Sequence, residues 1–88
     1  MNIIRYLATD FTEWEEYVVG DINENGETLR KVVPTELMFI SKLKNFISNN
    51  PFDHVSETSI RFALQILEKY HTVDEDLLIT EMKEVGIL

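Results

Sequence analysis

The chain has 88 residues and a mass of 10.3 kDa, enough for one hydrophobic core and too little for a second domain. Hydrophobic residues make up 44% and charged residues 27%, a composition typical of globular proteins that argues against intrinsic disorder. Disulfides and thiolate chemistry are excluded because there is no cysteine, and a cytoplasmic location is expected for the same reason. No apolar run approaches the length of a membrane span. We therefore expect residues 1–88 to form one globular domain.

The net charge of −8 is unevenly distributed along the chain. Residues 10–27 hold seven acidic side chains and no basic one, residues 28–50 hold four basic side chains and one acid, and residues 74–88 carry −4. Most of such a surface repels a phosphate backbone, which disfavours nucleic acid as a partner. The acids either serve solubility alone or form a patch that faces a basic partner protein.

Residues 2–19 are expected to form an amphipathic helix. At helical spacing their apolar side chains fall within one arc of about 140°. These side chains are Ile3, Ile4, Leu7, Ala8, Phe11, Trp14 and Val18. Thr9, Asp10 and Thr12 interrupt the pattern, and Asp10-x-x-Glu13 matches a capping box. The helix therefore either continues or restarts near residue 10, with a strand or a short turn before it.

Residues 17–33 change to an alternating pattern, which predicts one β-hairpin. Asn25-Gly26 is a strong signal for a type I′ turn, in which both central residues have positive φ. Folding the chain there places Ile22 opposite Leu29 and Asp21 opposite Arg30, so that the apolar residues share one face.

Three helices are expected after the hairpin, over residues 35–49, 56–70 and 72–84. The first is capped by Thr35 and ends at Asn49-Asn50-Pro51; the second is capped by Ser56 or Asp53. The third begins with a capping box, Thr72-x-x-Glu75, and stops before Gly86. Apolar side chains surround much of the 56–70 segment, which predicts that this helix is the centre of the fold. The expected class is a helix-rich α+β single domain with one β-hairpin and a three-helix C-terminal part.

No motif indicates catalysis or a cofactor. The stretch Asp21-x-Asn23-x-Asn25-Gly26 resembles the first half of an EF-hand calcium loop, but the position of the bidentate glutamate is occupied by Val32. A polar turn is the simpler interpretation. His54 and His71 share no helical face, and no cysteine could complete a zinc site. We expect no enzyme activity, no metal and no cofactor.

Two classes of function stay open. In the first, the chain is a small acidic non-enzymatic protein that binds a basic partner protein, as an adaptor, an inhibitor or an immunity-type factor; a homodimer is also possible. In size and charge it is similar to small acidic accessory proteins of bacteria and phages. Acidic and aromatic side chains at the edge of the N-terminal helix are the predicted partner-binding residues. These are Tyr6, Asp10, Glu13, Glu16 and Tyr17, of which Glu13 and Glu16 are expected to point away from the core.

The alternative is a small DNA-binding regulator that uses the 56–70 segment as its recognition helix. Arg61, Gln65 and Lys69 are spaced four residues apart and therefore share one helical face. Glu57 and Glu68 lie close to this face, which weakens its positive potential.

Overall fold

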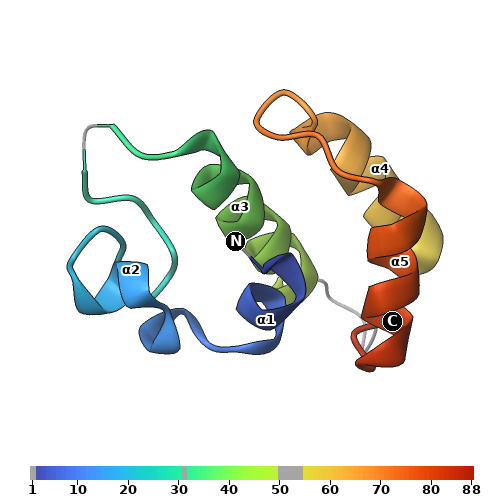
Figure 1. Ribbon diagram of the computed structural model, residues 1–88, viewed down its shortest axis with the longest axis horizontal. Coiled ribbons are helices and arrows are strands. Elements are labelled where there is room, and N and C mark those ends of the chain that lie inside the picture. Colours follow the sequence, from blue (N-terminus) through green and yellow to red (C-terminus); the bar gives the residue numbers. More distant parts are fainter. Residues whose placement is uncertain (1, 31, 50–54) are drawn as a thin grey trace.

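The computed structural model describes residues 2–30, 32–49 and 55–88, and every regular element in them is helical (Figure 1). The elements are α1 (Ile3–Ala8), the 3₁₀ helix η1 (Phe11–Glu13), α2 (Glu15–Val18), α3 (Thr35–Ser48), α4 (Glu57–Leu67) and α5 (Glu75–Glu84). The predicted α+β class with a β-hairpin is wrong, because the described residues contain one isolated β-bridge and no strand.

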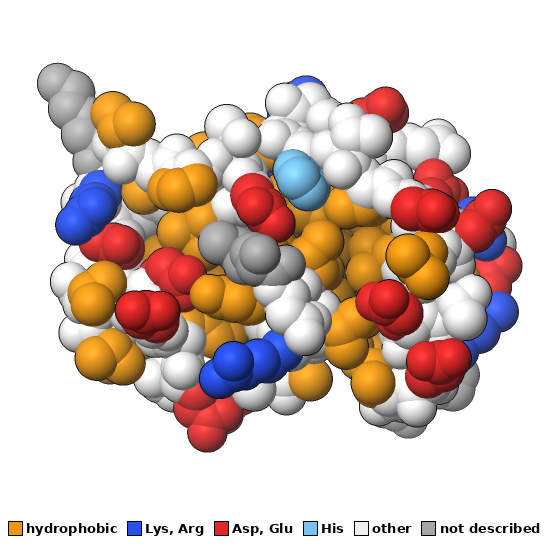
Figure 2. Space-filling model, in the orientation of Figure 1, with side chains coloured by type: hydrophobic (Ala, Val, Ile, Leu, Met, Phe, Trp, Pro, Cys, Tyr) orange, Lys and Arg blue, Asp and Glu red, His pale blue; other side chains and the backbone are white. Residues whose placement is uncertain are grey.

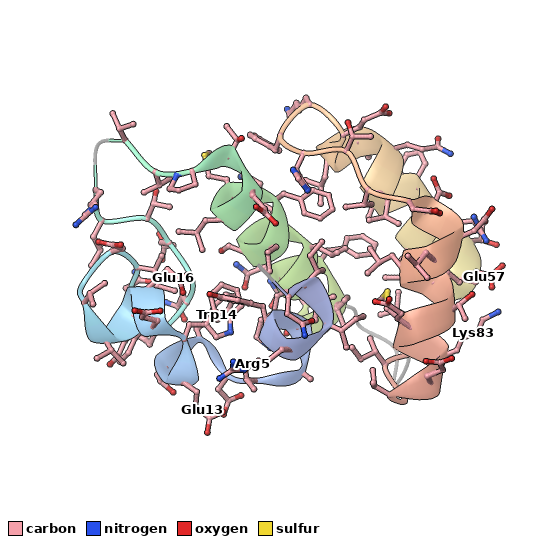
Figure 3. All side chains as sticks on the ribbon, in the orientation of Figure 1. Arg5, Glu13, Trp14, Glu16, Glu57 and Lys83 are labelled. Carbon is pink, nitrogen blue, oxygen red and sulfur yellow. The ribbon has the colours of Figure 1, made fainter. Side chains whose placement is uncertain are left out.

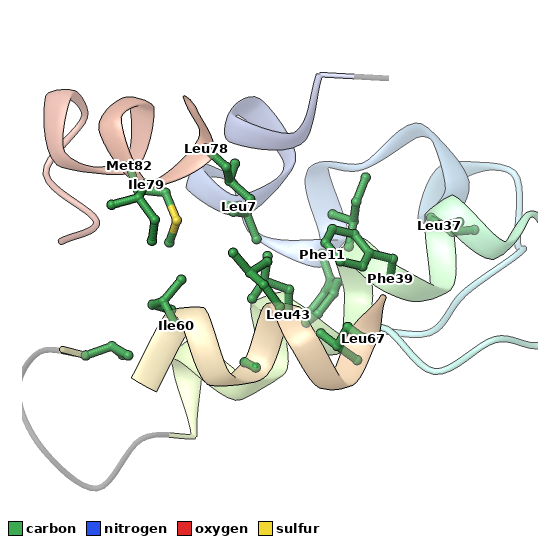
Figure 4. Packing of buried hydrophobic residues seen from close by; sticks show 14 of the residues in the cluster. Leu7, Phe11, Leu37, Phe39, Leu43, Ile60, Leu67, Leu78, Ile79 and Met82 are labelled. Atoms are coloured by element: carbon green, nitrogen blue, oxygen red, sulfur yellow. The ribbon is translucent and has the colours of Figure 1, made fainter. Parts of the chain in front are cut away.

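Four helices enclose the core. α3 packs against α1 and α4, and α5 packs against α4 and α1, while η1 and α2 lie beside each other at the other end of the molecule (Figure 1). Figure 4 shows the side chains that these helices turn toward one another. The largest fully buried side chains are Leu37, Phe39, Ile40 and Leu43 of α3, Ile60 of α4, Met82 of α5 and, from the loop after α2, Ile22.

The expected continuous helix over residues 2–19 is wrong. Helical structure restarts near residue 10 as the alternative predicted, but the helix α1, and not a strand or a turn, precedes it. α1 ends at Ala8, Thr9 is extended, and η1 begins at Phe11. Trp14 explains the break, because its indole Nε1 donates to the carbonyl oxygens of Tyr6 at 3.1 Å and Thr9 at 3.3 Å. Carbonyls at the end of a helix lack intrahelical hydrogen-bond donors. Here the indole of Trp14, which is 98% buried, supplies the missing donor.

A turn is present at Asn23–Gly26, but it is not the predicted type I′ turn. No non-glycine residue in the described ranges has positive φ, so Asn25 does not adopt the conformation that a type I′ turn needs. Instead the Gly26 N–H donates to the carbonyl of Asn23 at 3.0 Å. The Asn23 Oδ1 accepts from the backbone N–H groups of Asn25 and Glu27. Asparagine at the first and glycine at the fourth position are typical of a type I turn.

The register of this loop differs by one residue from the prediction. Ile22 forms its bridge with Thr28 rather than lying opposite Leu29. Since a slip of one residue moves a side chain to the other face, Leu29 is 62% exposed while Ile22 is buried. Asp21 and Arg30, which were predicted to lie opposite each other in a hairpin, form an ion pair of 2.6 Å without that strand pairing.

The three C-terminal helices are confirmed, with two differences at their first residues. Ser56 caps α4 as predicted, accepting from the Ser59 N–H. Asp74, not Thr72, caps α5. In α3 the capping position is Pro34 rather than Thr35, and it makes no side-chain bond. Asn50, Pro51, Asp53 and His54, which entered the predictions, lie outside the described residues.

The prediction that α4 is buried on most sides is wrong. Its first apolar stripe is buried as expected. Phe62 and Ile66 on the opposite side are 63% and 52% exposed. Leu77 on α5 and Val85, which caps the end of α5, are likewise more than half exposed.

Candidate functional site

The five predicted partner-binding residues separate into two groups. Asp10, Glu13 and Tyr17 are exposed, and they belong to the N-terminal segment that η1 and α2 form. Tyr6 and Glu16 are half-buried and face each other across the break between α1 and α2. The structure therefore brings the first group to the surface and uses the second inside the fold.

The Tyr6–Glu16 pair is an internal link. The Tyr6 hydroxyl donates to Glu16 Oε1 at 2.7 Å, and the Tyr6 ring meets the Trp14 ring edge to face at 4.7 Å. Glu16 Oε2 is buried and has no hydrogen-bond partner among the described residues. Burial and the neighbouring carboxylate both disfavour the phenolate, so the pKa of Tyr6 rises to about 12. The expectation that Glu16 points into solvent is wrong.

The surface itself is acidic. Five of the seven acids between residues 10 and 27 are exposed, and we call them the acidic surface: Asp10, Glu13, Glu15, Glu24 and Glu27. Among the residues that the structure describes, the only ion pair formed by an acid of this segment joins Asp21 to Arg30. Figure 2 shows red acidic side chains interspersed with orange ones over the end of the molecule that holds α2.

Two hollows border the acidic surface. Glu13 and Glu15 line one of about 270 Å³, together with Arg5 and the edges of Tyr6 and Trp14. Figure 3 shows Glu13 and Arg5 on the same side of Trp14. Two carboxylates in one concave site favour a cationic side chain over an anionic one.

The second hollow, of about 400 Å³, lies between Asp10, Glu24 and α3. Lys44 also lines it, and its Nζ donates to the carbonyl of Leu7 at 3.1 Å. Burial lowers the pKa of Lys44, and the charge of Asp10 partly opposes that shift. The Lys44 ammonium is thus held by a contact within the fold, whereas Asp10 and Glu24 are exposed at this hollow.

Exposed hydrophobic side chains accompany the acids. Val18 is 74%, Val19 60% and Leu29 62% exposed, and Tyr17 is at 36%. The Leu29 N–H donates to the carbonyl of Asp21 at 2.8 Å, so Leu29 lies beside the end of α2. Exposed apolar residues next to charged ones are typical of a protein contact. Tyr17 was among the predicted partner-binding residues. Val18 and Leu29 were not, because Val18 was placed in the apolar arc and Leu29 on the apolar face of the hairpin.

The residues of the DNA-binding alternative are partly engaged in the fold. Arg61 forms ion pairs with Glu57 at 3.5 Å, Glu75 at 3.1 Å and Asp76 at 2.9 Å, which raise its pKa. A guanidinium surrounded by three carboxylates is poorly placed to approach a base edge. Lys69 remains exposed on this face.

Side chains of the EF-hand-like stretch are used by the loop itself. Asp21 pairs with Arg30, and the Asn23 side chain holds its own turn. The described ranges hold no group of three or more His, Cys, Asp or Glu residues arranged for a metal ion. His71 lies 3.9 Å from Glu36 Oε1 and meets the Phe39 ring edge to face.

Over residues 2–30, 32–49 and 55–88, no helix is both long and apolar enough to cross a bilayer. Comparison with protein-family models, curated proteins and solved structures finds no match for this chain. Its function is therefore argued from its surface chemistry.

Proposed function

We propose that this chain is a small non-enzymatic protein that binds a basic surface of a partner protein through the acidic surface, as an adaptor, inhibitor or immunity-type factor. One observation carries the proposal: five exposed acids, without an ion pair among the described residues, accompany apolar side chains as exposed as Val18 and Leu29. The expectation of a cytoplasmic location is kept, and it depends on the cysteine-free composition alone.

The two kinds of side chain have different parts in this proposal. Acids that form no ion pair among the described residues repel one another and so oppose compaction, whereas they speed the encounter with an oppositely charged protein. Apolar side chains such as Val18, Val19 and Leu29 contribute once water is removed from them, at roughly 25 cal/mol per Å². Charge therefore governs how fast the complex forms, and the apolar contacts govern how long it lasts.

Affinity capture from the native host tests the proposal with a matched pair of variants. The test variant combines Glu13→Lys with Glu24→Lys. The control combines Glu68→Lys with Glu84→Lys, two exposed acids on the C-terminal helices, and changes the net charge by the same amount. A partner retained by wild type and control but lost by the test variant supports the acidic surface. Equal loss in both variants would mean that only net charge matters, and would refute it.

A further inference from the structure

A groove lies between the start of α1 and the first half of α5. Its volume is about 330 Å³, and Ile3, Val73 and Leu77 give it an apolar floor and wall. Asp74 and Glu81 line the same hollow on the α5 side. Figure 2 shows hydrophobic side chains in the hollow at the middle of the molecule, with acidic ones beside α5. We call this site the α5 groove.

A ridge of opposite character lies on the outer side of α4. Phe62 and Ile66 are 63% and 52% exposed and lie one helical turn apart, with Lys69 exposed three residues further along. The Lys69 Nζ lies 5.1 Å from the centre of the Tyr70 ring. No ion pair links Lys69 to an acid in the described part of the chain. We call Phe62, Ile66 and Lys69 the α4 ridge.

We propose that the α5 groove binds the α4 ridge of a second copy of this chain. Two apolar side chains at i and i+4 are how an amphipathic helix enters a hydrophobic groove. The charges also match, since the ridge ends in a lysine and the groove carries Asp74 and Glu81. On a chain with a net charge of −8, contact between groove and ridge brings opposite charges together.

The contact joins two different surfaces of the chain, the α4 ridge of one copy and the α5 groove of another. The ridge lies on the side of α4 away from its buried residues Ile60 and Leu64, so it cannot reach the groove of its own chain. When one ridge occupies one groove, each pair of copies keeps a free groove and a free ridge. When a further copy fills each free groove, association continues into rings or chains, and when two copies fill each other's grooves about a two-fold axis, it stops at a dimer. One helix face is a small contact, so the assembly should be weak and depend on concentration.

Complementation between two variants tests the proposal. The groove variant combines Leu77→Ala with Glu81→Lys, and the ridge variant combines Phe62→Ala with Ile66→Ala. Sedimentation over a concentration series should show the wild type exceeding the mass of a monomer. Each variant alone should associate at least about tenfold more weakly. Their equimolar mixture should form a one-to-one heterodimer and nothing larger, because each supplies the site that the other lacks.

Two further variants keep the test decisive if either double variant loses helical circular dichroism. Lys69→Glu alone should weaken assembly, and mixing it with Glu81→Lys should restore it by exchanging the charges. Glu13→Lys with Glu24→Lys should assemble like the wild type, because the acidic surface takes no part. A wild type that stays monomeric at every concentration would overturn the proposal. It would also be overturned if neither mixture restored assembly, or if the acidic-surface variant lost it.

Discussion

Replacing Gly26 by alanine tests how the loop after α2 docks onto α3. Gly26 is buried, its φ is +77°, and its carbonyl accepts from Ser41 Oγ at 2.6 Å. The neighbouring carbonyl of Asn25 accepts from Asn45 Nδ2 at 3.1 Å. A Cβ at Gly26 would overlap the Phe11 ring and lie 2.7 Å from Ser41 Oγ. The substitution therefore affects both the backbone conformation and the packing of the loop.

The two effects have separate magnitudes. Positive φ costs an L-residue with a Cβ about 1–2 kcal/mol. Forcing an extra methyl group against a buried ring costs typically about 1–3 kcal/mol more. We expect Gly26→Ala to lower the free energy of unfolding by about 2–5 kcal/mol. A domain of this length has about 4–13 kcal/mol in total, so much of its stability would be lost.

Gly20→Ala is the matched control. Gly20 has nearly the same φ, +85°, and nothing lies within 4 Å of the Cβ position. This variant should therefore cost only the backbone term, about 1–2 kcal/mol. Urea denaturation followed by circular dichroism gives both values, and an unchanged m-value confirms that the same transition is compared.

The difference between the two variants isolates the packing of the loop on Phe11 and Ser41. Gly26→Ala should cost at least about 1 kcal/mol more than Gly20→Ala. If the two free energies of unfolding agree within about 0.5 kcal/mol, the close contact around Gly26 does not exist and the described docking of the loop is wrong.

Three further predictions concern the helices and their polar contacts. Leu64→Ala should lower the free energy of unfolding by about 2–5 kcal/mol, and Ile66→Ala should lower it by less than about 0.5 kcal/mol. Urea titration of dilute protein measures both, and equal losses would contradict the orientation of α4. Because the folded-state pKa of Tyr6 is about 12, above its ordinary 10.0, stability should fall as pH rises from 10 toward 12. In Tyr6→Phe this alkaline decrease in stability should be smaller. Denaturation at several pH values tests this, and a decrease as steep as that of the wild type would contradict it. A hydrogen bond from Lys83 lowers the pKa of Glu57 below 4.5, so stability should decrease as pH falls through that region, and less so in Lys83→Met.

Helices 35–49, 56–70 and 72–84 were predictable because local signals decide them. Ser56 lies directly before an apolar stripe, and Gly86 lies directly after one. The Gly86 N–H donates to the Lys83 carbonyl and the Ile87 N–H to the Met82 carbonyl, which is the Schellman arrangement. Such signals need only a few neighbouring residues, so they can be interpreted without knowing the tertiary fold.

Residues 2–33 were harder because contacts between separate elements decide them. The Trp14 indole holds the end of α1, and Ser41 on α3 holds the loop at Gly26. Neither contact has a sequence signal, since both join residues whose spacing fits no helix or hairpin pattern. The same limit applies to the candidate site. The exposure of Glu13 was predicted from helical periodicity, although Glu13 lies in η1 and not in a continuous helix. The bond between Tyr6 and Glu16 depends on a chain reversal that periodicity does not show.

The association rate with the captured partner, measured in low and in high salt, tests the proposed function most directly. Rim charges act mainly on the association rate and its salt dependence. Wild type and Glu68→Lys/Glu84→Lys should bind fast in low salt and slow down steeply as salt is added. Glu13→Lys/Glu24→Lys should bind at least about tenfold more slowly in low salt and show little salt dependence. If Glu13→Lys/Glu24→Lys binds at the wild-type rate with the wild-type salt dependence, the acidic surface is not the binding surface.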